Sequence, residues 1–484
     1  MVREVILYGA GKRCRALCEI LKWSDVSVVA VIDSDEKKWG KEISGYPIQP
    51  PKEAEKLQNV SVCITMSNPE AVEQIRRQYQ DLFYWNSIKE IGFYDLILEI
   101  YRDHSKIRRW ITEYTINTQK EETVLFDCYQ GLVLGGVESW TMDICKALLS
   151  RGRKSTYIIS DGGTYDIEED LLGHIIDVDI NHDMRFVPSS IWKLAEVILI
   201  KLPCKVVTCS TDEVMLAAYL VKCFYPDQIK IISVIHNSCE AVYDAYRDFR
   251  ECTDIYIGVS QDIRNDMIQD GVAPELVYSM TCPFACKKTL VRSYTEDYDQ
   301  PIRIGYAGRI DHWSEREHSQ KRMDLLLKCI RILEQRKVNY MVELAGDGPG
   351  RPQMEQYMYE HNLNKRIRFL GRVKRTEISA FWHRQDICIN LADYEGRSIS
   401  IIEAMGNGAV PVVTETSGTR EDITDGVNGY RVPVGDFVSA ADRIEYLASH
   451  REYLRKMGES AHGAVYPKSL MEPHVNFWEE ILFP

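Results

Sequence analysis

The sequence predicts an α/β protein that contains three successive Rossmann-like domains. Short apolar strands alternate with helical patterns along most of the 484 residues, which is typical of parallel sheets with crossover helices. Hydrophobic residues make up 45% and charged residues 27% of the chain, an ordinary globular composition that argues against disorder, collagen and coiled coil. At about 150 residues per domain, the length favours about three domains.

Changes in composition set the predicted domain boundaries. The polar, charged run at 99–122 and the run "YTEDYDQP", which ends at Pro301, mark the two main junctions. We expect an accessory domain over 1–110, a linker over 111–121, a second domain over 122–298, a third over 299–468, and a final helix over 469–484 that packs back on the second domain.

Charge and cysteine content narrow the classes of function. The chain has 59 basic and 72 acidic residues, a net charge of −13 that disfavours nucleic-acid binding. None of the 14 cysteines forms a Cys-x-x-Cys, so we interpret them as buried small side chains in a reducing cytoplasm. The opening strand is no signal peptide and no apolar run approaches 18 residues. We expect a cytoplasmic protein.

The first segment carries a Gly-x-Gly after its opening strand, in "ILYGAGKRC". Gly9 and Gly11 lie where a dinucleotide fold has its phosphate loop, and Asp33, 24 residues after Gly9, lies where such folds bind ribose. Cys14 takes the place of the third glycine. These residues are a candidate second nucleotide site, and a structural or partner-docking role is the alternative.

The second segment contains two candidate features at strand ends. "TVLFDCYQGLVLGGVESW" predicts a strand, a glycine-rich loop and a helix, and Gly135 and Gly136 would let backbone N–H groups approach a phosphate. His236 follows the strand in "SVIHNS". A helix at 189–202 is amphipathic with few charges, and we expect it to face the core rather than a membrane.

The third segment contains the most informative string, "YEGRSISIIEAMGNGAVPVV", with Glu395 and Glu403 separated by seven residues. Spacing alone means little, but Glu395 follows a strand and Ser398 or Ser400 can cap the helix that carries Glu403. The carboxyl end of a parallel strand and a helix N-terminus together form a ligand site. Carboxylates there can accept hydrogen bonds from sugar hydroxyls.

With these motifs, residues 122–484 resemble the retaining GT-B glycosyltransferases of family four, whose E-x7-E motif matches Glu395 and Glu403. The resemblance implies that Glu395 contacts the donor sugar, that Glu403 contacts the ribose diol, and that His236 orients the sugar. It also implies that Arg309 of "GYAGRI" and Lys321 clamp the diphosphate. Two departures are the long, charged stretch between Arg309 and Lys321 and the Lys-Arg pair at 321–322, where the family has Lys-Gly.

The same resemblance extends to the turns around the donor. Donor-binding positions implied by it are Gly135, Gly136, Gly346, Gly348, Arg372, Val373, Gly396, Arg397 and Ser398. The segment 1–110 resembles the small nucleotide-sugar-binding domain at the N-terminus of bacterial sugar O- and N-acyltransferases. Its "GAG", "VVAVIDSD" and "EISGYPI" carry that likeness.

The expected function is transfer of a hexosyl unit from a nucleoside-diphosphate sugar to a glycan or lipid-linked glycan hydroxyl, in bacterial surface polysaccharide or glycoconjugate synthesis. UDP is expected on frequency alone. No cofactor or metal is expected, because two fixed cations can neutralise the leaving diphosphate. A nucleotide-sugar epimerase and a catalytically silent scaffold protein are the alternatives. The basic-aromatic helix around Trp110 is either a solvated linker or a peripheral contact with the inner face of a membrane.

Overall fold

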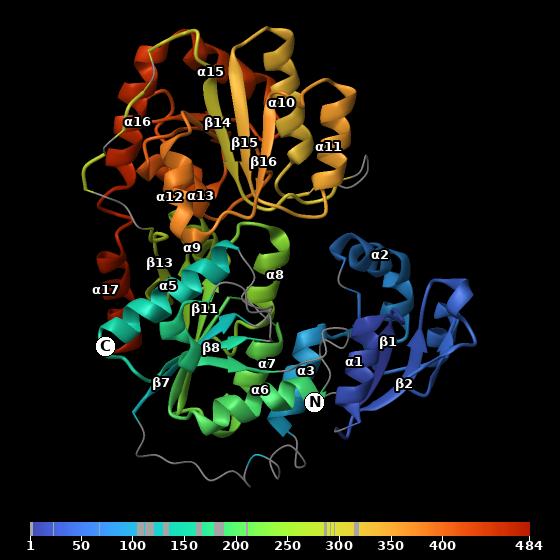
Figure 1. Cartoon of the computed structure of the whole chain (residues 1–484). Coiled ribbons are helices and arrows are strands. Elements are labelled where there is room, and N and C mark those ends of the chain that lie inside the picture. Colours follow the sequence, from blue (N-terminus) through green and yellow to red (C-terminus); the bar gives the residue numbers. More distant parts are fainter. Residues whose placement is uncertain are drawn as a thin grey trace. The chain divides into compact units, whose positions relative to one another are not determined.

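The computed structural model describes most of the chain, shown in Figure 1. The described residues are 3–22, 24–66, 68–103, 111, 121–128, 135–160, 167–178, 188–209, 212–284, 288–290, 292–294, 296–313 and 319–484. The contacts between residues divide the chain into two compact units. Unit 1 comprises 1–132, 154–233 and 244–254, and unit 2 comprises 133–153, 234–243 and 255–484. The predicted domain boundaries stay predictions.

Unit 1 begins with a six-stranded mixed sheet in the order β3-β4-β2-β1-β5-β6. All its pairings are parallel except that of β3 with β4. The order reverses between β1 and β5, so the loops that follow these two strands meet at a topological switch point. The strands are β1 (Glu4–Tyr8), β2 (Ser27–Ile32), β3 (Glu42–Ile43), β4 (Tyr46–Gln49), β5 (Ser61–Ile64) and β6 (Lys89–Glu90).

Each helix around this first sheet buries one apolar face, as an amphipathic sequence predicts. Helix α1 begins after Gly11 and buries Cys14, Leu17, Cys18 and Leu21. The helices are α1 (Lys12–Leu21), α2 (Pro69–Trp85) and α3 (Phe93–Asp103), with the short 3₁₀ helices η1 (Glu36–Lys38) and η2 (Pro51–Lys56).

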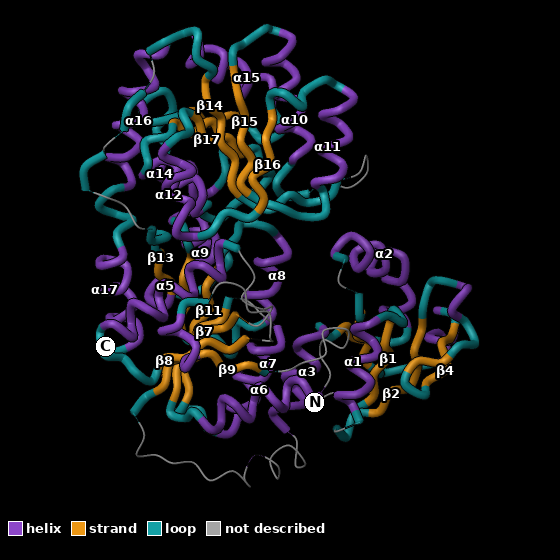
Figure 2. The backbone as a smooth tube through the Cα atoms, in the orientation of Figure 1, coloured by secondary structure: helices purple, strands orange, loops and turns teal. Residues whose placement is uncertain are grey.

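Unit 1 also contains parallel strands in the order β11-β10-β7-β8-β9 (orange in Figure 2). They are β7 (Thr123–Cys128), β8 (Thr156–Ser160), β9 (Ile175–Asp177), β10 (Cys204–Thr208) and β11 (Ile229–Ile235), and the division between the units falls within β11. The associated helices are η3 (Glu169–His174), α6 (Pro188–Ile200), α7 (Asp212–Phe224) and α8 (Glu240–Asp248), and α8 is also divided.

One hydrophobic cluster joins the two sheets of unit 1. It contains Leu17 of α1, Leu96 of α3, Ile198 of α6 and Leu216 of α7. Helix α6 therefore faces the core, as its sequence predicts. No helix in the described ranges is both long and apolar enough to cross a bilayer.

Unit 2 is built on a six-stranded parallel sheet in the order β16-β15-β14-β17-β18-β19. The order reverses between β14 and β17, which places the switch point of this sheet between the loops after those strands. The strands are β14 (Ile302–Ala307), β15 (Tyr340–Ala345), β16 (Ile367–Gly371), β17 (Ile387–Asn390), β18 (Val410–Thr414) and β19 (Tyr430–Val432), and the pair β12 (Ile255–Gly258) and β13 (Val277–Ser279) also belongs to unit 2.

The helices of unit 2 come from separate segments of the chain. Helix α17 packs on α5, far earlier in the sequence. The helices are α5 (Gly136–Ser150), α9 (Gln261–Gln269), η5 (Pro274–Leu276), α10 (Met323–Gln335), α11 (Arg351–Glu360), α12 (Arg375–His383), α13 (Ile399–Gly406), α14 (Ser417–Asp422), α15 (Phe437–Ser449), α16 (Arg451–Val465) and α17 (Met471–Leu482).

Candidate functional site

The switch point of the unit 2 sheet carries an ion pair between Lys321 and Glu395. Lys321 ends the loop after β14 and Glu395 lies in the loop after β17, and the lysine Nζ contacts Oε1 of the glutamate. The two side chains are only 15% and 11% exposed. The structure thus brings two of the predicted site residues into direct contact where open α/β sheets bind ligands.

The loop after β14 and the turn after β15 are interlocked. A Cβ atom on Gly346 would lie 1.9 Å from the carbonyl oxygen of Gly308, and one on Gly348 would lie 2.4 Å from that of Ile310. Both contacts are with backbone, which cannot move aside as a flexible side chain can. The two predicted glycines are therefore required by the close approach of two backbone segments.

The carboxyl end of β11 approaches the Glu395 loop. The Ser238 hydroxyl donates to the Glu395 carbonyl over 3.1 Å, and a Cβ on Gly396 would lie 2.2 Å from the His236 carbonyl oxygen. The His236 imidazole meets the Trp140 ring at 4.9 Å between centroids, in a T-shaped arrangement. Burial lowers the pKa of His236 to about 4, so this imidazole is neutral at physiological pH.

Arg309 is an exposed site cation, with 62% of its side chain accessible. Its Nη2 lies 3.5 Å from Gln320 Oε1 and 3.8 Å from Asp311 Oδ2. Burial raises the pKa of Glu138 near the start of α5, and the charge of Arg309 opposes that rise. Glu138 lies in the first turn of α5, the helix that Gly135 caps, so the charge of Arg309 acts at that end of the helix.

Arg322 explains one departure from the family pattern. Its backbone is left-handed, with a φ of 45°, at the cap of α10. Glycine adopts this conformation without strain, which accounts for the Lys-Gly that the family has here. Arg322 instead forms ion pairs with Asp324 at 3.0 Å and Asp393 at 2.8 Å. The second pair ties this loop to the segment before Glu395.

The side chain of Arg397 is committed to a buried ion network. Its Nε donates to Asp422 Oδ2 over 2.9 Å, its Nη1 lies 3.2 Å from Glu421 Oε2, and Nη1 also donates to the Val259 carbonyl over 3.3 Å. A donor contact by Arg397 stays a prediction. The sequence pattern did not single out Asp422, because nothing local marks it as the partner of a residue 25 positions earlier.

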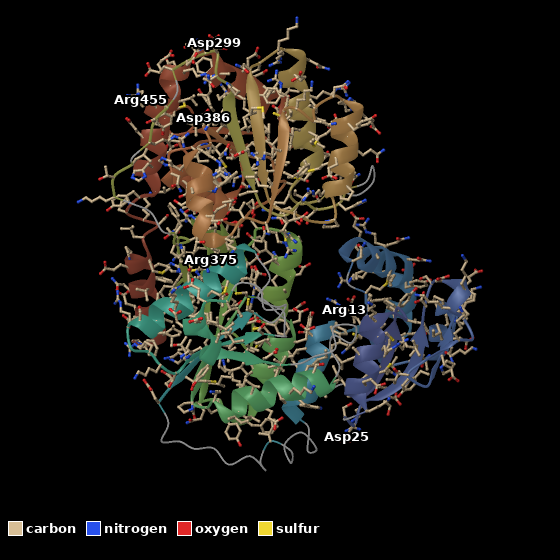
Figure 3. All side chains as sticks on the ribbon, viewed as in Figure 1. Arg13, Asp25, Asp299, Arg375, Asp386 and Arg455 are labelled. Carbon is tan, nitrogen blue, oxygen red and sulfur yellow. The ribbon has the colours of Figure 1, made fainter. Side chains whose placement is uncertain are left out.

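Glu403 lies on α13 beside a second ion pair that the sequence did not indicate. Burial raises the pKa of Glu403 to about 7; the nearby Trp382 and Arg375 oppose the rise, and Asp143 adds to it. Arg375 of α12 contacts Asp143 of α5 through Nη2 and Oδ1 (Arg375 is labelled in Figure 3). The ionisation of Glu403 is therefore coupled to this pair.

The remaining predicted donor positions lie at the same edge of the sheet. Ser398 is the N-cap residue of α13, but its hydroxyl lies 3.0 Å from that of Ser400 and makes no side-chain cap. Arg372 and Val373 follow β16, and the last residue of that strand, Gly371, accepts a hydrogen bond from Gly346 N–H over 2.8 Å. A Cβ atom added to Gly136 would lie 3.7 Å from the side chain of Ile399, at ordinary van der Waals distance.

In unit 1, Asp33 is engaged by its own loop. Its Oδ2 accepts hydrogen bonds from Ala10 N–H at 2.7 Å and from Lys38 at 2.8 Å. Burial works to raise the pKa of Asp33, but these bonds and that from Asp35 hold it below its usual value. Gly9 has a φ of 101°, and Gly11 caps α1 with open space around it. Nucleotide binding here stays a prediction, and the bonds supply the structural role that was its alternative.

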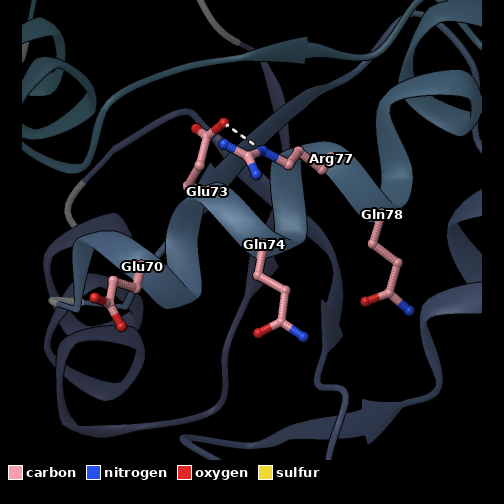
Figure 4. Close-up of a pocket in the computed structure, with 5 residues that line it drawn as sticks. All are labelled: Glu70, Glu73, Gln74, Arg77 and Gln78. Atoms are coloured by element: carbon pink, nitrogen blue, oxygen red, sulfur yellow. Dashed lines mark hydrogen bonds and ion pairs between the residues drawn. The ribbon is translucent and has the colours of Figure 1, made fainter.

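Two further features involve none of these residues. Glu70, Glu73, Gln74, Arg77 and Gln78 of α2 line a shallow surface depression (Figure 4). It contains no predicted site residue. The side chains of the basic-aromatic helix at 102–110 lie outside the described residues. Among the residues that the structure describes, no group of three His, Cys, Asp or Glu could hold a metal ion, and metal independence stays a prediction.

Two family models match the chain. Residues 299–463 match "Glycosyl transferases group 1", and residues 1–87 match "C2185-like, N-terminal". The first match covers the interlocked loops, Lys321, Glu395 and Glu403. The third segment of the chain therefore resembles group 1 glycosyltransferases, and the expected likeness of the first segment to sugar acyltransferases stays a prediction.

Curated relatives match over part of their length. The uncharacterized glycosyltransferase YqgM of Bacillus subtilis is 26% identical over 34% of this chain and 46% of its own length. Alpha-D-kanosaminyltransferase of Streptomyces kanamyceticus is 27% identical over 34% of this chain and 40% of its own. The chain thus spans less than half the length of these two relatives.

Solved structures share the fold. HepE of Anabaena, in complex with UDP and glucose, superposes with a TM-score of 0.60 at 16% identity and covers 75% of this chain and 99% of its own. The lipopolysaccharide outer core galactosyltransferase WaaB gives a TM-score of 0.57 at 15% identity, over 74% and 99%. The predicted fold class is confirmed: an α/β protein with parallel sheets and the fold of GT-B glycosyltransferases, plus an N-terminal domain whose sheet is mixed.

Proposed function

We propose that the protein is a retaining glycosyltransferase that moves a hexosyl unit from a nucleoside-diphosphate sugar to a hydroxyl of a glycan or lipid-linked glycan. The observation that carries the proposal is the contact of Lys321 with Glu395 at the switch point of the sheet. A cation and an acid held there match the two needs of the donor, charge neutralisation at the diphosphate and hydrogen bonding at the sugar.

The reaction needs no metal in this proposal. The bond between the anomeric carbon and the diphosphate oxygen breaks while the acceptor oxygen forms a new bond on the same face. The leaving diphosphate takes the acceptor proton. Lys321 and Arg309 offset the charge that develops on the diphosphate, and Glu395 turns from Lys321 to the sugar hydroxyls. Glu403 accepts from the ribose, and His236, neutral at physiological pH, orients the sugar.

The relatives support a UDP-sugar and a surface glycan. HepE was solved with UDP-glucose, and the lipopolysaccharide 1,6-galactosyltransferase of Escherichia coli is 26% identical over 213 residues. We propose the same class of donor and acceptor for this chain, in the cytoplasm or at the inner face of the membrane. The group 1 family match of residues 299–463 supports a transferase rather than a scaffold.

Donor binding and turnover test this proposal. A thermal-shift panel of UDP-, GDP- and ADP-sugars identifies the donor, since a ligand at 100 times its dissociation constant adds about 2.7 kcal/mol of stability. Lys321→Ala and Glu395→Ala are then expected to lower transfer and donor hydrolysis. Lys328→Ala is the matched control, because Lys328 is a half-exposed lysine of α10 paired with Asp324.

Three outcomes would contradict the proposal. Unchanged transfer and hydrolysis in both site variants would show that Lys321 and Glu395 do not act in the reaction. Epimerisation of UDP-N-acetylglucosamine without acceptor would indicate an epimerase. Tight nucleotide-sugar binding without release of free nucleotide, whatever the acceptor, would indicate a scaffold protein.

A further inference from the structure

Trp140 of α5 connects the final helix with His236. Its side chain is fully buried, and its indole Nε1 donates to Nε2 of His474 on α17 over 2.9 Å. The same indole meets the ring of His236 at 4.9 Å between centroids, with the planes 65° apart. One indole thus contacts both imidazoles, which are 238 positions apart in the sequence (474 minus 236).

The hydrogen bond fixes the protonation state of His474. Nε2 can accept from the indole only when that nitrogen carries no proton. Burial lowers the pKa of His474 to about 3, against the opposing effect of the Thr281 backbone. The bond therefore persists from neutral to mildly acidic pH, and the indole stays fixed.

A second set of contacts secures the other end of α17. Glu479 forms ion pairs with Arg151 and Arg153, both at 3.0 Å. The Arg153 guanidinium also lies 4.0 Å from the centroid of the Phe483 ring. These contacts involve neither atom of the hydrogen bond between Trp140 and His474, so a change at Glu479 disturbs α17 without removing that bond.

We propose that Trp140 and His474 are positioning residues that hold the imidazole of His236 in the orientation that the donor sugar requires. The hydrogen bond from Trp140 to His474 fixes the plane of the indole, and the indole then limits the rotation of the His236 ring. The final helix contributes to the site through this contact. The inference rests on the proposed role of His236 in glycosyl transfer.

Steady-state kinetics of four variants test the proposal. His474→Leu leaves the indole N–H without its acceptor, Trp140→Phe removes the donor, and each is expected to lower kcat by about 10- to 100-fold through misplacement of His236. Thermal shift by UDP is expected to stay unchanged. His474→Gln keeps an acceptor oxygen and is expected to restore most of kcat. Glu479→Gln is the control that loosens α17 elsewhere and is expected to lower Tm while preserving kcat.

A spectroscopic measurement makes the test independent of turnover. In protein with isotope-labelled histidine, the His236 resonances are assigned by their loss in His236→Gln. In His474→Leu and Trp140→Phe we expect the His236 ring resonances to shift, because the indole that faces this imidazole moves or is replaced, and in His474→Gln to stay close to those of the wild type.

The outcomes separate the two proposals. Unchanged His236 resonances in both His474→Leu and Trp140→Phe would overturn the positioning role, and so would an equal effect of Glu479→Gln. Suppose that the His236 resonances change as expected but the wild-type protein transfers no sugar from any donor. Trp140 and His474 then orient His236 in the fold without a role in catalysis. The proposed function and the positioning role in transfer then both fail.

Discussion

The backbone of Gly396 lies so close to the His236 carbonyl that a Cβ atom would sit 2.2 Å from its oxygen. Gly396→Ala must therefore push two backbone segments apart, and we expect it to cost about 1–3 kcal/mol of unfolding free energy and most of the transfer activity. Urea unfolding measures the first effect. Gly463→Ala is the matched control, because Gly463 lies in α16 with nothing within 4 Å of an added Cβ. That control is expected to be neutral or stabilising, and equal behaviour of both variants would contradict the close approach.

Arg322 offers a test of backbone strain. Its φ of 45° disfavours any side chain, whereas its ion pairs with Asp324 and Asp393 favour arginine. Arg322→Ala and Arg322→Gly both lose the ion pairs, but only the glycine variant loses the strain. We expect the glycine variant to be more stable than the alanine variant by about 1 kcal/mol in chemical unfolding. An alanine variant of equal or greater stability would show that this residue is not left-handed in solution.

The raised pKa of Glu403 predicts how the stability of the protein depends on pH. Its pKa is raised from 4.5 to about 7, so the folded protein binds more protons than the unfolded chain between those pH values. The contribution of Glu403 to stability is therefore full below about pH 4.5 and is lost as the pH rises through 7. The difference in unfolding free energy, wild type minus Glu403→Gln, is expected to fall between pH 5 and pH 8, by at most about 3 kcal/mol. A difference that stays constant, or rises, would contradict the burial of this carboxyl.

The Arg397 network predicts a loss of stability from a residue in the candidate site. Arg397→Gln leaves Asp422, which is 8% exposed, as a buried carboxylate without its main partner. We expect a cost of about 3–5 kcal/mol and a lower Tm. Asp422→Asn in the Arg397→Gln background should recover part of that loss. A stable but inactive Arg397→Gln variant would instead indicate that the guanidinium contacts the donor.

Local pattern was enough to predict the fold class, whereas the family resemblance placed Lys321 and Glu395 in one site, and their direct contact was not predicted. Alternating strands and helices predict a parallel sheet, and the carboxyl ends of its strands gather loops at one edge. Residues at the ends of β14 and β17 must therefore approach one another, whatever their separation in sequence. The glycines of the turn after β15 were also found through the family resemblance.

Contacts between helices from distant segments could not be predicted in this way. Arg375 and Asp143 are 232 positions apart, and Trp140 and His474 are 334 apart. The sequence around each of these residues does not distinguish it from an ordinary side chain of a helix. Only the packing of α12 and α17 with α5 determines their partners, and that packing depends on the tertiary fold. The role of Asp33 was ambiguous for a related reason, because a carboxylate at a strand end can bind ribose or its own glycine loop.

For the transferase proposed above, the interlocked loops after β14 and β15 limit how a new donor preference can be acquired. Gly346 and Gly348 have no room for a side chain, because the facing surface is backbone rather than flexible atoms. Variation that enlarges either position disrupts the loops before it can alter recognition of the nucleotide. Changes in specificity are therefore confined to side chains around this fixed frame. Arg309 lies outside that frame: 62% of its side chain is exposed, and its Nη2 lies 3.5 Å from Gln320 and 3.8 Å from Asp311.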